Sequence, residues 1–246
     1  MNCELTKQAM IFAAGLGTRL RPITDTKPKA LVPVAGEPLI WHVIQKLKRA
    51  GYERIVVNVH HFANQIIDYL NANNNFGLDI RISDETGALL ETGGGIRHAR
   101  PLFDAASPIL IHNVDILSDA NLLALHEQAV TTDADATLLV SQRQSSRALV
   151  FDTATKRLTG WHNITTGEVK GIVDGGTSLA FSGIHIISPR LLPLMDTWPE
   201  RFSIIDFYLH VCQQANIQAY IMPDLHLMDI GKLDTLSAAD DFATSL

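Results

Sequence analysis

The chain carries the stretch AAGLGTRLRPITDTKPKALVP at residues 13–33. The apolar run AMIFAA at residues 9–14 leads into it and is typical of a strand buried in a parallel sheet. Gly15 and Gly17 allow backbone N–H groups to approach an anion closely. Four cationic side chains follow within residues 19–29. The stretch therefore predicts a phosphate-binding turn at the end of a buried strand, and a solvated basic loop is the alternative.

Two common phosphate-binding motifs do not match this turn. The dinucleotide-binding fingerprint GxGxxG requires a third glycine at position 20, where the chain has Leu20. A Walker A loop requires Gly-Lys followed by Ser or Thr, and no such sequence follows. The mismatch disfavours a nicotinamide-dependent dehydrogenase and a P-loop NTPase.

Strands and helices alternate through the first 140 residues or so. This alternation predicts an α/β fold: a Rossmann-like mixed, mostly parallel sheet with helices on both faces. Strands are expected at residues 9–14, 54–59, 78–82, 108–112 and 136–141, and helices at residues 37–50, 63–73, 93–103 and 121–130.

The pattern changes near residue 140. Residues 148–151, 158–162 and 179–187 read as strands separated by turns, which predicts a small inserted β subregion over one side of a site. Helices at residues 189–195, 203–214 and 232–244 and a strand at residues 217–222 complete the chain. Because no Pro-, Gly- or Ser-rich linker separates the halves, we expect one domain over residues 1–246, in two parts that meet near residue 140.

Composition narrows the functional classes. The chain has 246 residues, a net charge of −6 and a pI near 5.9, which argues against nucleic acid or an anionic membrane as a partner. No apolar run is long enough for a transmembrane helix. Two cysteines, Cys3 and Cys212, cannot form a disulfide framework, so we expect reduced thiols and a cytoplasmic protein. The oligomeric state stays open, and the size permits a monomer.

The pattern GxGTRxxP followed by KPKxLxPV resembles the N-terminal motif of the sugar-1-phosphate nucleotidyltransferases, the NDP-sugar pyrophosphorylases. The resemblance extends over nearly the whole chain. ETGGGI at residues 91–96 is similar to the segment that contacts the nucleotide base in that family. NVD at residues 113–115 is similar to its metal-binding xGD, FSGI at residues 181–184 to its sugar-contacting strand, and MDIG at residues 228–231 to its C-terminal W-x-D-I/V-G.

The resemblance implies a set of site residues. It implies a nucleotide triphosphate and a sugar 1-phosphate as substrates, and Mg²⁺ as the cofactor. The implied catalytic residues are Arg19, Lys29 and Asp115; the nucleotide-binding residues are Ala14, Gly15, Gly17, Thr18, Arg19, Lys29, Glu91, Thr92 and Gly93; the substrate-binding residues are Asn113, Gly183 and Asp229; and the metal ligands are Asp115 and Asp229.

The chemistry of such a reaction suits these residue types. Both substrates are polyanions, so catalysis consists largely of positioning and charge neutralisation. Arg19 can neutralise the leaving phosphates and Lys29 can bridge the two reacting phosphates, while Asp115 and Asp229 are hard oxygen ligands that suit Mg²⁺. As alternatives, Asp115 could be a helix N-cap and Asp229 a turn residue.

The substrate can be narrowed further by resemblance. The sequence LETGGGI most resembles the N-acetylmuramate-1-phosphate uridylyltransferases of peptidoglycan recycling, which favours UTP. The EKP segment of relatives that act on mannose or glucose 1-phosphate is missing, since GWHN stands at residues 160–163. A mannose- or heptose-1-phosphate guanylyltransferase is the alternative enzyme. An inactive regulatory subunit of the same fold is the alternative from another class.

Overall fold

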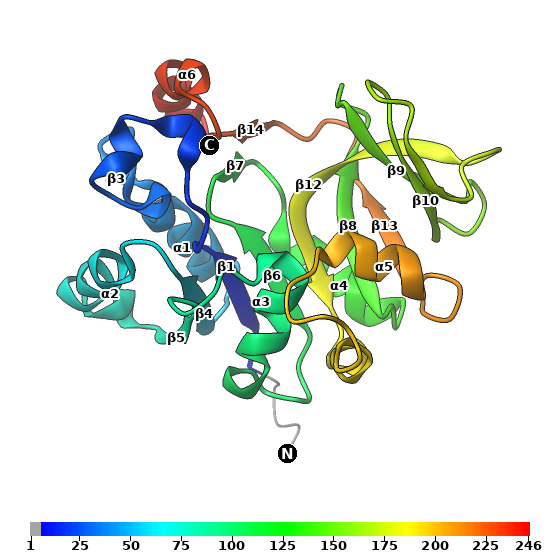
Figure 1. Cartoon of the computed structure of the whole chain (residues 1–246), viewed down its shortest axis with the longest axis horizontal. Coiled ribbons are helices and arrows are strands. Elements are labelled where there is room, and N and C mark those ends of the chain that lie inside the picture. Colours follow the sequence, from blue (N-terminus) through cyan, green and yellow to red (C-terminus); the bar gives the residue numbers. More distant parts are fainter. Residues whose placement is uncertain (1–5) are drawn as a thin grey trace.

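The computed structural model describes residues 6–246, so Cys3 lies outside the described residues. Within them, a large mixed sheet has the strand order β11-β10-β9-β12-β6-β1-β4-β5, with β8 and β13 joined to it through β12 (Figure 1). Its left part in Figure 1 is parallel and consists of β6 (Ile109–Asn113), β1 (Gln8–Phe12), β4 (Arg54–Val59) and β5 (Asp79–Asp84).

The second part of the sheet is built around one long strand. β12 (Thr177–Ile187) runs antiparallel to β6 and continues past it, so that its first residues pair with the inserted strands. The strands of this part are β8 (Ala136–Ser141), β9 (Arg147–Phe151), β10 (Leu158–Asn163), β11 (Val169–Gly171) and β13 (Ile217–Ile221). The expected β subregion is therefore present and extends from the same sheet.

Helices cover both faces of the sheet, as expected. One face is covered by α1 (Leu39–Arg49), α2 (Ala63–Ala72) and α4 (Leu122–Thr131). Their buried residues belong to one apolar cluster, which also includes Ala239 of α6 (Leu233–Thr244). The other face is covered by α3 (Glu91–Ala99), α5 (Ile204–Val211) and the 3₁₀ helix Pro189–Met195, whose residues belong to a second cluster. The sheet separates these two cores.

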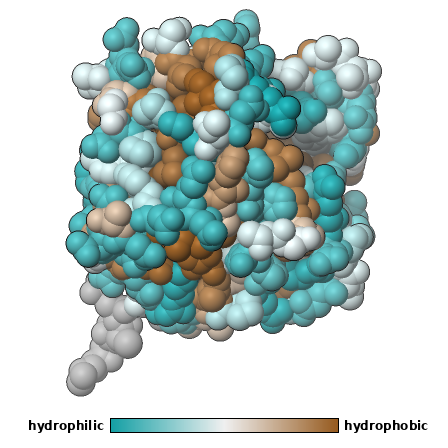
Figure 2. Space-filling view, turned by 60° about the vertical axis from the view of Figure 1, so that its left-hand side comes forward, coloured by the Kyte–Doolittle hydropathy of each residue, from teal (hydrophilic) through white to brown (hydrophobic). Residues whose placement is uncertain are grey.

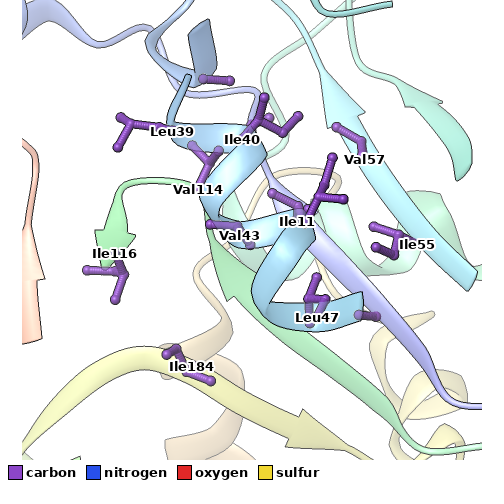
Figure 3. Close-up of a cluster of buried hydrophobic side chains, with 14 of the residues drawn as sticks. Ile11, Leu39, Ile40, Val43, Leu47, Ile55, Val57, Val114, Ile116 and Ile184 are labelled. Carbon is purple, nitrogen blue, oxygen red and sulfur yellow. The ribbon is translucent and has the colours of Figure 1, made fainter. Parts of the chain in front are cut away.

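Helix α1 shows how the sequence pattern becomes packing. Its apolar side chains recur at helical spacing and are almost completely buried against β1, β4 and β6 (Figure 3). Burial of each such side chain contributes about 1.5–3 kcal/mol relative to exposure. Gly51, with φ 79°, follows the helix in the left-handed conformation that commonly ends one.

Several element boundaries differ from the expected ones. The strand expected at residues 9–14 ends at Phe12, because Ala13 and Ala14 donate their N–H groups to a side chain instead of a neighbouring strand. The helix expected from residue 37 begins at Leu39, because Pro38 is extended. Pro193 lies within residues 189–195, which form a 3₁₀ rather than an α-helix.

Short elements without sequence periodicity were not expected. These are β2 (Pro33–Val34), β3 (Glu37–Pro38), β7 (Ile116–Ser118), β14 (Leu227–Asp229) and the short 3₁₀ helices at Thr18–Leu20, Ile23–Asp25, Lys29–Leu31, Asn74–Gly77 and Arg100–Leu102. β14 pairs with β7 and leads into α6, which lies beside β2.

The surface is mainly hydrophilic. In the face shown by Figure 2, hydrophilic residues cover most of the area, and apolar residues lie between them in patches. No helix in the described part of the chain has both the length and the apolar character needed to cross a bilayer. Cys212 is buried and donates its thiol to the Leu209 carbonyl at 3.2 Å.

Candidate active site

The carboxyl ends of the parallel strands open on one cleft. The chain passes from β1 to β4 and β5 on one side, then returns to β6 on the other side of β1, and such a reversal creates a crevice at the strand ends. A cavity of about 570 Å³, here called the main cleft, lies at this place. Most of the sequence-predicted site residues line it: Ala14, Gly15, Gly17, Thr18, Arg19, Lys29, Glu91, Thr92, Asn113 and Asp115.

The glycine turn forms one wall of the main cleft. Gly17 has φ 62°, and a Cβ there would lie 2.9 Å from the Thr24 side chain. The Gly17 carbonyl accepts from the Leu20 N–H at 2.9 Å and from the Thr24 hydroxyl at 2.8 Å. Gly15 has open space around its Cα on the cleft side of the chain. The turn needs glycine at position 17 because of both its backbone conformation and this close contact.

Lys29 and Asp115 form an ion pair in the main cleft. Lys29 lies in a 3₁₀ turn after Pro28 and is only 8% exposed, whereas Asp115 follows β6 in the chain. Burying two charges is expensive, and their attraction often only compensates for the lost hydration. The ion pair is therefore weak evidence for a contribution to stability. Its position in the main cleft instead indicates a functional role.

Asp229 reaches this ion pair through two short strands. Asp229 pairs with Ile116 in the β7–β14 ladder, and the Ile230 N–H donates to the Asp115 carbonyl at 2.8 Å. A Cβ on Gly231 would stand 2.6 Å from the Asp229 carboxylate and 2.8 Å from the Arg19 guanidinium. The geometry thus brings Arg19, Lys29, Asp115 and Asp229 to one region.

The two carboxylates influence one another electrostatically. Asp229 is accessible to solvent at the rim, yet its pKa is raised, first by desolvation in the concave surface and then by the negative charge of Asp115. Lys29 and Arg19 act in the opposite direction. A divalent cation would relieve the repulsion between the carboxylates, so this donor set fits Mg²⁺, which commonly binds one or two carboxylates together with substrate phosphates. Within residues 6–246, there is no group of three or more His, Cys, Asp or Glu side chains that could hold a metal ion. A metal at Asp115 and Asp229 would therefore need further ligands, such as the substrate phosphates.

Glu91, Thr92 and Gly93 form the first turn of α3 rather than a loop. The Gly93 N–H donates to the Phe202 carbonyl at 2.9 Å, and the Ile204 N–H donates to the Thr92 hydroxyl at 2.9 Å. A Cβ on Gly93 would lie 2.2 Å from the Phe202 ring, so Gly93 is a packing position and does not line the main cleft. Glu91 and Thr92 do line it.

Asn113 and Gly183 contact each other beside the main cleft. Gly183 lies in β12 with φ 76°, where the pairing with β8 is irregular, and a Cβ on it would stand 2.6 Å from the Asn113 amide nitrogen. A second cavity of about 540 Å³, here called the side pocket, lies next to this region under the inserted strands. Asp229 lines the side pocket, and Ser203 lines both cavities.

Three polar residues that line the main cleft were not identified from the sequence. Asn58 and Glu85 lie at the ends of β4 and β5, and Ser203 is the N-cap of α5. Asn58 interrupts the otherwise apolar strand RIVVNV, and that polar residue was the available signal. Nothing local in the sequence distinguishes Ser203 from other helix caps.

Size alone does not locate the site. A larger cavity of about 790 Å³ lies between α1 and α4 and contains none of the sequence-predicted site residues. The main cleft is distinguished by its chemistry: a glycine turn followed by Arg19 and Lys29, with Lys29 paired to Asp115, at the ends of parallel strands. This arrangement suits a polyanionic ligand such as a nucleotide.

Comparison with known families matches residues 8–245 to the family described as nucleotidyl transferase. The chain belongs to the nucleotidyl transferase family. Among its curated relatives, the N-acetylmuramate alpha-1-phosphate uridylyltransferase of Caulobacter vibrioides is 39% identical over 96% of this chain and 97% of that protein. The protein of that name from Neisseria meningitidis serogroup B is 37% identical over 75% of this chain and 76% of that protein.

Solved structures share the nucleotidyl transferase fold. A putative glucose-1-phosphate thymidylyltransferase from Bacillus anthracis aligns with a TM-score of 0.83 and 16% identity over 98% of this chain and 96% of that chain. A UDP-glucose pyrophosphorylase crystallised with UDP-glucose aligns with a TM-score of 0.81 and 17% identity over 98% and 99% of the two chains. These likenesses support the expected Rossmann-like mixed sheet.

Proposed function

We propose that this nucleotidyl transferase family member transfers a uridylyl group from UTP to N-acetylmuramate 1-phosphate and releases pyrophosphate, in the cytoplasm. The observation that carries the proposal is the main cleft, in which the glycine turn lies with the paired Lys29 and Asp115, next to the side pocket that Asp229 lines, with Ser203 lining both cavities. The two relatives that carry the uridylyltransferase name support this choice of nucleotide and sugar.

The reaction needs two polyanions held side by side. A phosphate oxygen of the sugar 1-phosphate attacks the α-phosphorus of UTP, and the bond from that phosphorus to the bridging oxygen of the β-phosphate breaks. The attacking oxygen is already anionic near neutral pH, so no general base is required. The site must therefore supply position and positive charge.

The residues of the main cleft fit these roles. In the proposal, the glycine turn and Arg19 hold the β- and γ-phosphates, which leave as pyrophosphate. Lys29 contacts the α-phosphate and the incoming sugar phosphate, because it lines the main cleft and is paired there with Asp115, a proposed metal ligand. Thr92 and Glu91 also line the main cleft, and in the proposal they contact the nucleoside.

Asp115 and Asp229 would hold the Mg²⁺ ion. When bound, the ion would neutralise phosphate charge and orient the α-phosphate. In the proposal, residues 1–140 bind the nucleotide and residues 141–246 form most of the sugar site. Asn113 and Gly183 contact each other where these two parts meet.

A pyrophosphate-release assay tests the proposed function. UTP, GTP, CTP and ATP would be crossed with the 1-phosphates of N-acetylmuramate, N-acetylglucosamine, glucose and mannose. We expect kcat/KM for UTP with N-acetylmuramate 1-phosphate to exceed that of every other pair by at least about tenfold, equivalent to about 1.4 kcal/mol.

Each outcome of the assay has a meaning. Preference for GTP with mannose 1-phosphate would replace the proposal with guanylyl transfer. Nucleotide binding without pyrophosphate release from any pair would instead support an inactive regulatory subunit.

A further inference from the structure

Asn58, near the end of β4, is hydrogen-bonded to the backbone just before the glycine turn of the main cleft. Its side-chain carbonyl oxygen accepts from the Ala13 N–H at 2.7 Å and from the Ala14 N–H at 3.2 Å. These are the first two N–H groups after β1 ends, and Ala14 directly precedes the glycine turn. One side chain therefore determines where the backbone leaves the sheet.

The other end of the same amide holds Glu85. The Asn58 side-chain N–H donates to one Glu85 carboxylate oxygen at 2.7 Å, and the Leu90 N–H approaches the other oxygen at 3.4 Å. Asn58 and Glu85 are each only 2% exposed. A Cβ on Gly95 would lie 2.8 Å from the Glu85 carboxylate, so α3 packs directly on this pair.

The pair joins the elements that form one end of the main cleft. Ala14 directly precedes the glycine turn, Glu85 follows β5, and Leu90 directly precedes α3. Arg19, Lys29 and Asp115 gather at the phosphate end, whereas an additional carboxyl at Glu85 would repel phosphates. The Asn58–Glu85 end of the main cleft therefore suits the uncharged nucleoside.

We propose that Asn58 is a positioning residue for the nucleotide. It acts through its hydrogen bonds to the Ala13–Ala14 backbone on one side and to Glu85 on the other. It holds the Ala13–Ala14 backbone in register with Glu85 and α3, so that the glycine turn and the nucleoside end keep a fixed separation. The inference rests on the proposed function, because it takes the main cleft to hold the nucleoside triphosphate. A buried amide can do this since it is acceptor and donor at once.

A reversal of the hydrogen bond tests the inference. In Asn58→Asp the acceptor for Ala13 and Ala14 remains, but the donor to Glu85 is lost and two buried carboxyls face each other. In the double variant Asn58→Asp/Glu85→Gln, the new amide at position 85 can donate to the new carboxylate at position 58. Asn121→Asp is the matched control, because Asn121 also accepts from a backbone N–H, at the start of α4.

Binding and kinetics give separate readouts. We expect Asn58→Asp to raise the dissociation constant and KM for UTP by about five- to hundredfold, the range for one lost buried hydrogen bond. KM for the sugar 1-phosphate should change by less than about twofold, since the sugar site is not in contact with the pair. The double variant should recover most of the loss, whereas Asn121→Asp should match the wild type.

The results separate this inference from the proposed function. If the wild type binds UTP but releases no pyrophosphate with any sugar phosphate, the proposed function fails and calorimetric UTP affinity still decides the role of Asn58. UTP affinity unchanged in Asn58→Asp, no recovery in the double variant, or equal losses for both substrates would overturn the inference. If Asn58→Asp fails to fold, as judged by circular dichroism, the double variant carries the test, because failure of a hydrogen-bond-matched pair to bind UTP would also overturn it.

Discussion

The charges of Lys29 and Asp115, taken as a pair, are not required for the stability of the fold. Lys29 and Asp115 are brought together at low exposure in the main cleft, where their mutual attraction barely compensates for their lost hydration. In the proposed function, the substrate phosphates would account for the cation and a divalent ion would account for the anion. The strongest functional predictions are therefore at the residue scale.

Lys29→Ala removes the buried ammonium. We expect kcat in the pyrophosphate assay to fall by about 10²–10³, because a preorganised charge on the reacting phosphates is lost. The melting temperature should also fall, because removing one partner of a buried ion pair leaves the Asp115 carboxylate uncompensated, so kcat is measured at a temperature at which both proteins remain folded. Lys48→Ala is the control, because Lys48 bonds the Phe76 carbonyl away from the main cleft. Normal turnover in Lys29→Ala would exclude the assigned role.

Asp115→Asn replaces a carboxylate by a neutral amide. We expect the Mg²⁺ concentration for half-maximal activity to rise by at least about tenfold, because an amide is a weaker ligand for a hard cation. Titration of Mg²⁺ at fixed UTP measures this shift. Asp196→Asn, at an exposed ion pair with Arg100, is the control. An unchanged Mg²⁺ titration would mean that Asp115 does not hold the metal.

At the scale of elements, α3 was expected from the sequence as a helix at residues 93–103, and the structure confirms a helix at Glu91–Ala99. The resemblance assigns ETGGGI to contact with the nucleotide base, and the structure adds that the Gly93 and Gly94 N–H groups at the start of α3 donate to the Phe202 carbonyl. The glycines serve close packing: Gly94 would place a Cβ 2.4 Å from the Glu200 carbonyl oxygen. A motif identifies residue types, whereas their partners come from a distant segment of the chain.

Gly94→Ala tests this packing. Alanine favours helices by up to about 1 kcal/mol, but overpacking against the rigid Glu200 backbone costs about 1–3 kcal/mol. We expect a net loss in the free energy of unfolding, measured by urea denaturation. Gly87→Ala is the control, because no atom lies within 4 Å of its added Cβ. A Gly94→Ala variant at least as stable as the wild type would contradict the packing role.

At the scale of the whole molecule, buried histidines couple stability to pH. His185 is completely buried beside Tyr208, and burial lowers its pKa from 6.5 to about 3. In the unfolded chain the same histidine binds a proton near pH 6.5, so between these values the unfolded state binds more protons. Stability should therefore decline as pH falls from about 6.5 towards 3, by about 1.4 kcal/mol per pH unit.

The variant His185→Leu isolates this contribution. Its free energy of unfolding should depend less on pH below about 6.5 than that of the wild type, whereas His61→Leu, at an exposed histidine, should follow the wild type. Denaturation at a series of pH values measures both slopes. Parallel curves for His185→Leu and the wild type would show that His185 does not contribute to acid sensitivity.

The local features of this protein can be predicted from the amino-acid sequence. The glycine turn with its cations, the apolar strands and the amphipathic helices are readable because each depends on neighbouring residues or on a regular period. The contacts between residues far apart in the chain, in contrast, are visible only in the folded structure. The two-strand pairing that brings Asp229 to Asp115 and the Asn58–Glu85 hydrogen bond join segments far apart in the chain. Short strands and single side-chain hydrogen bonds have no sequence periodicity, so the sequence does not show which residues they pair with. Their partners depend on how the whole sheet packs.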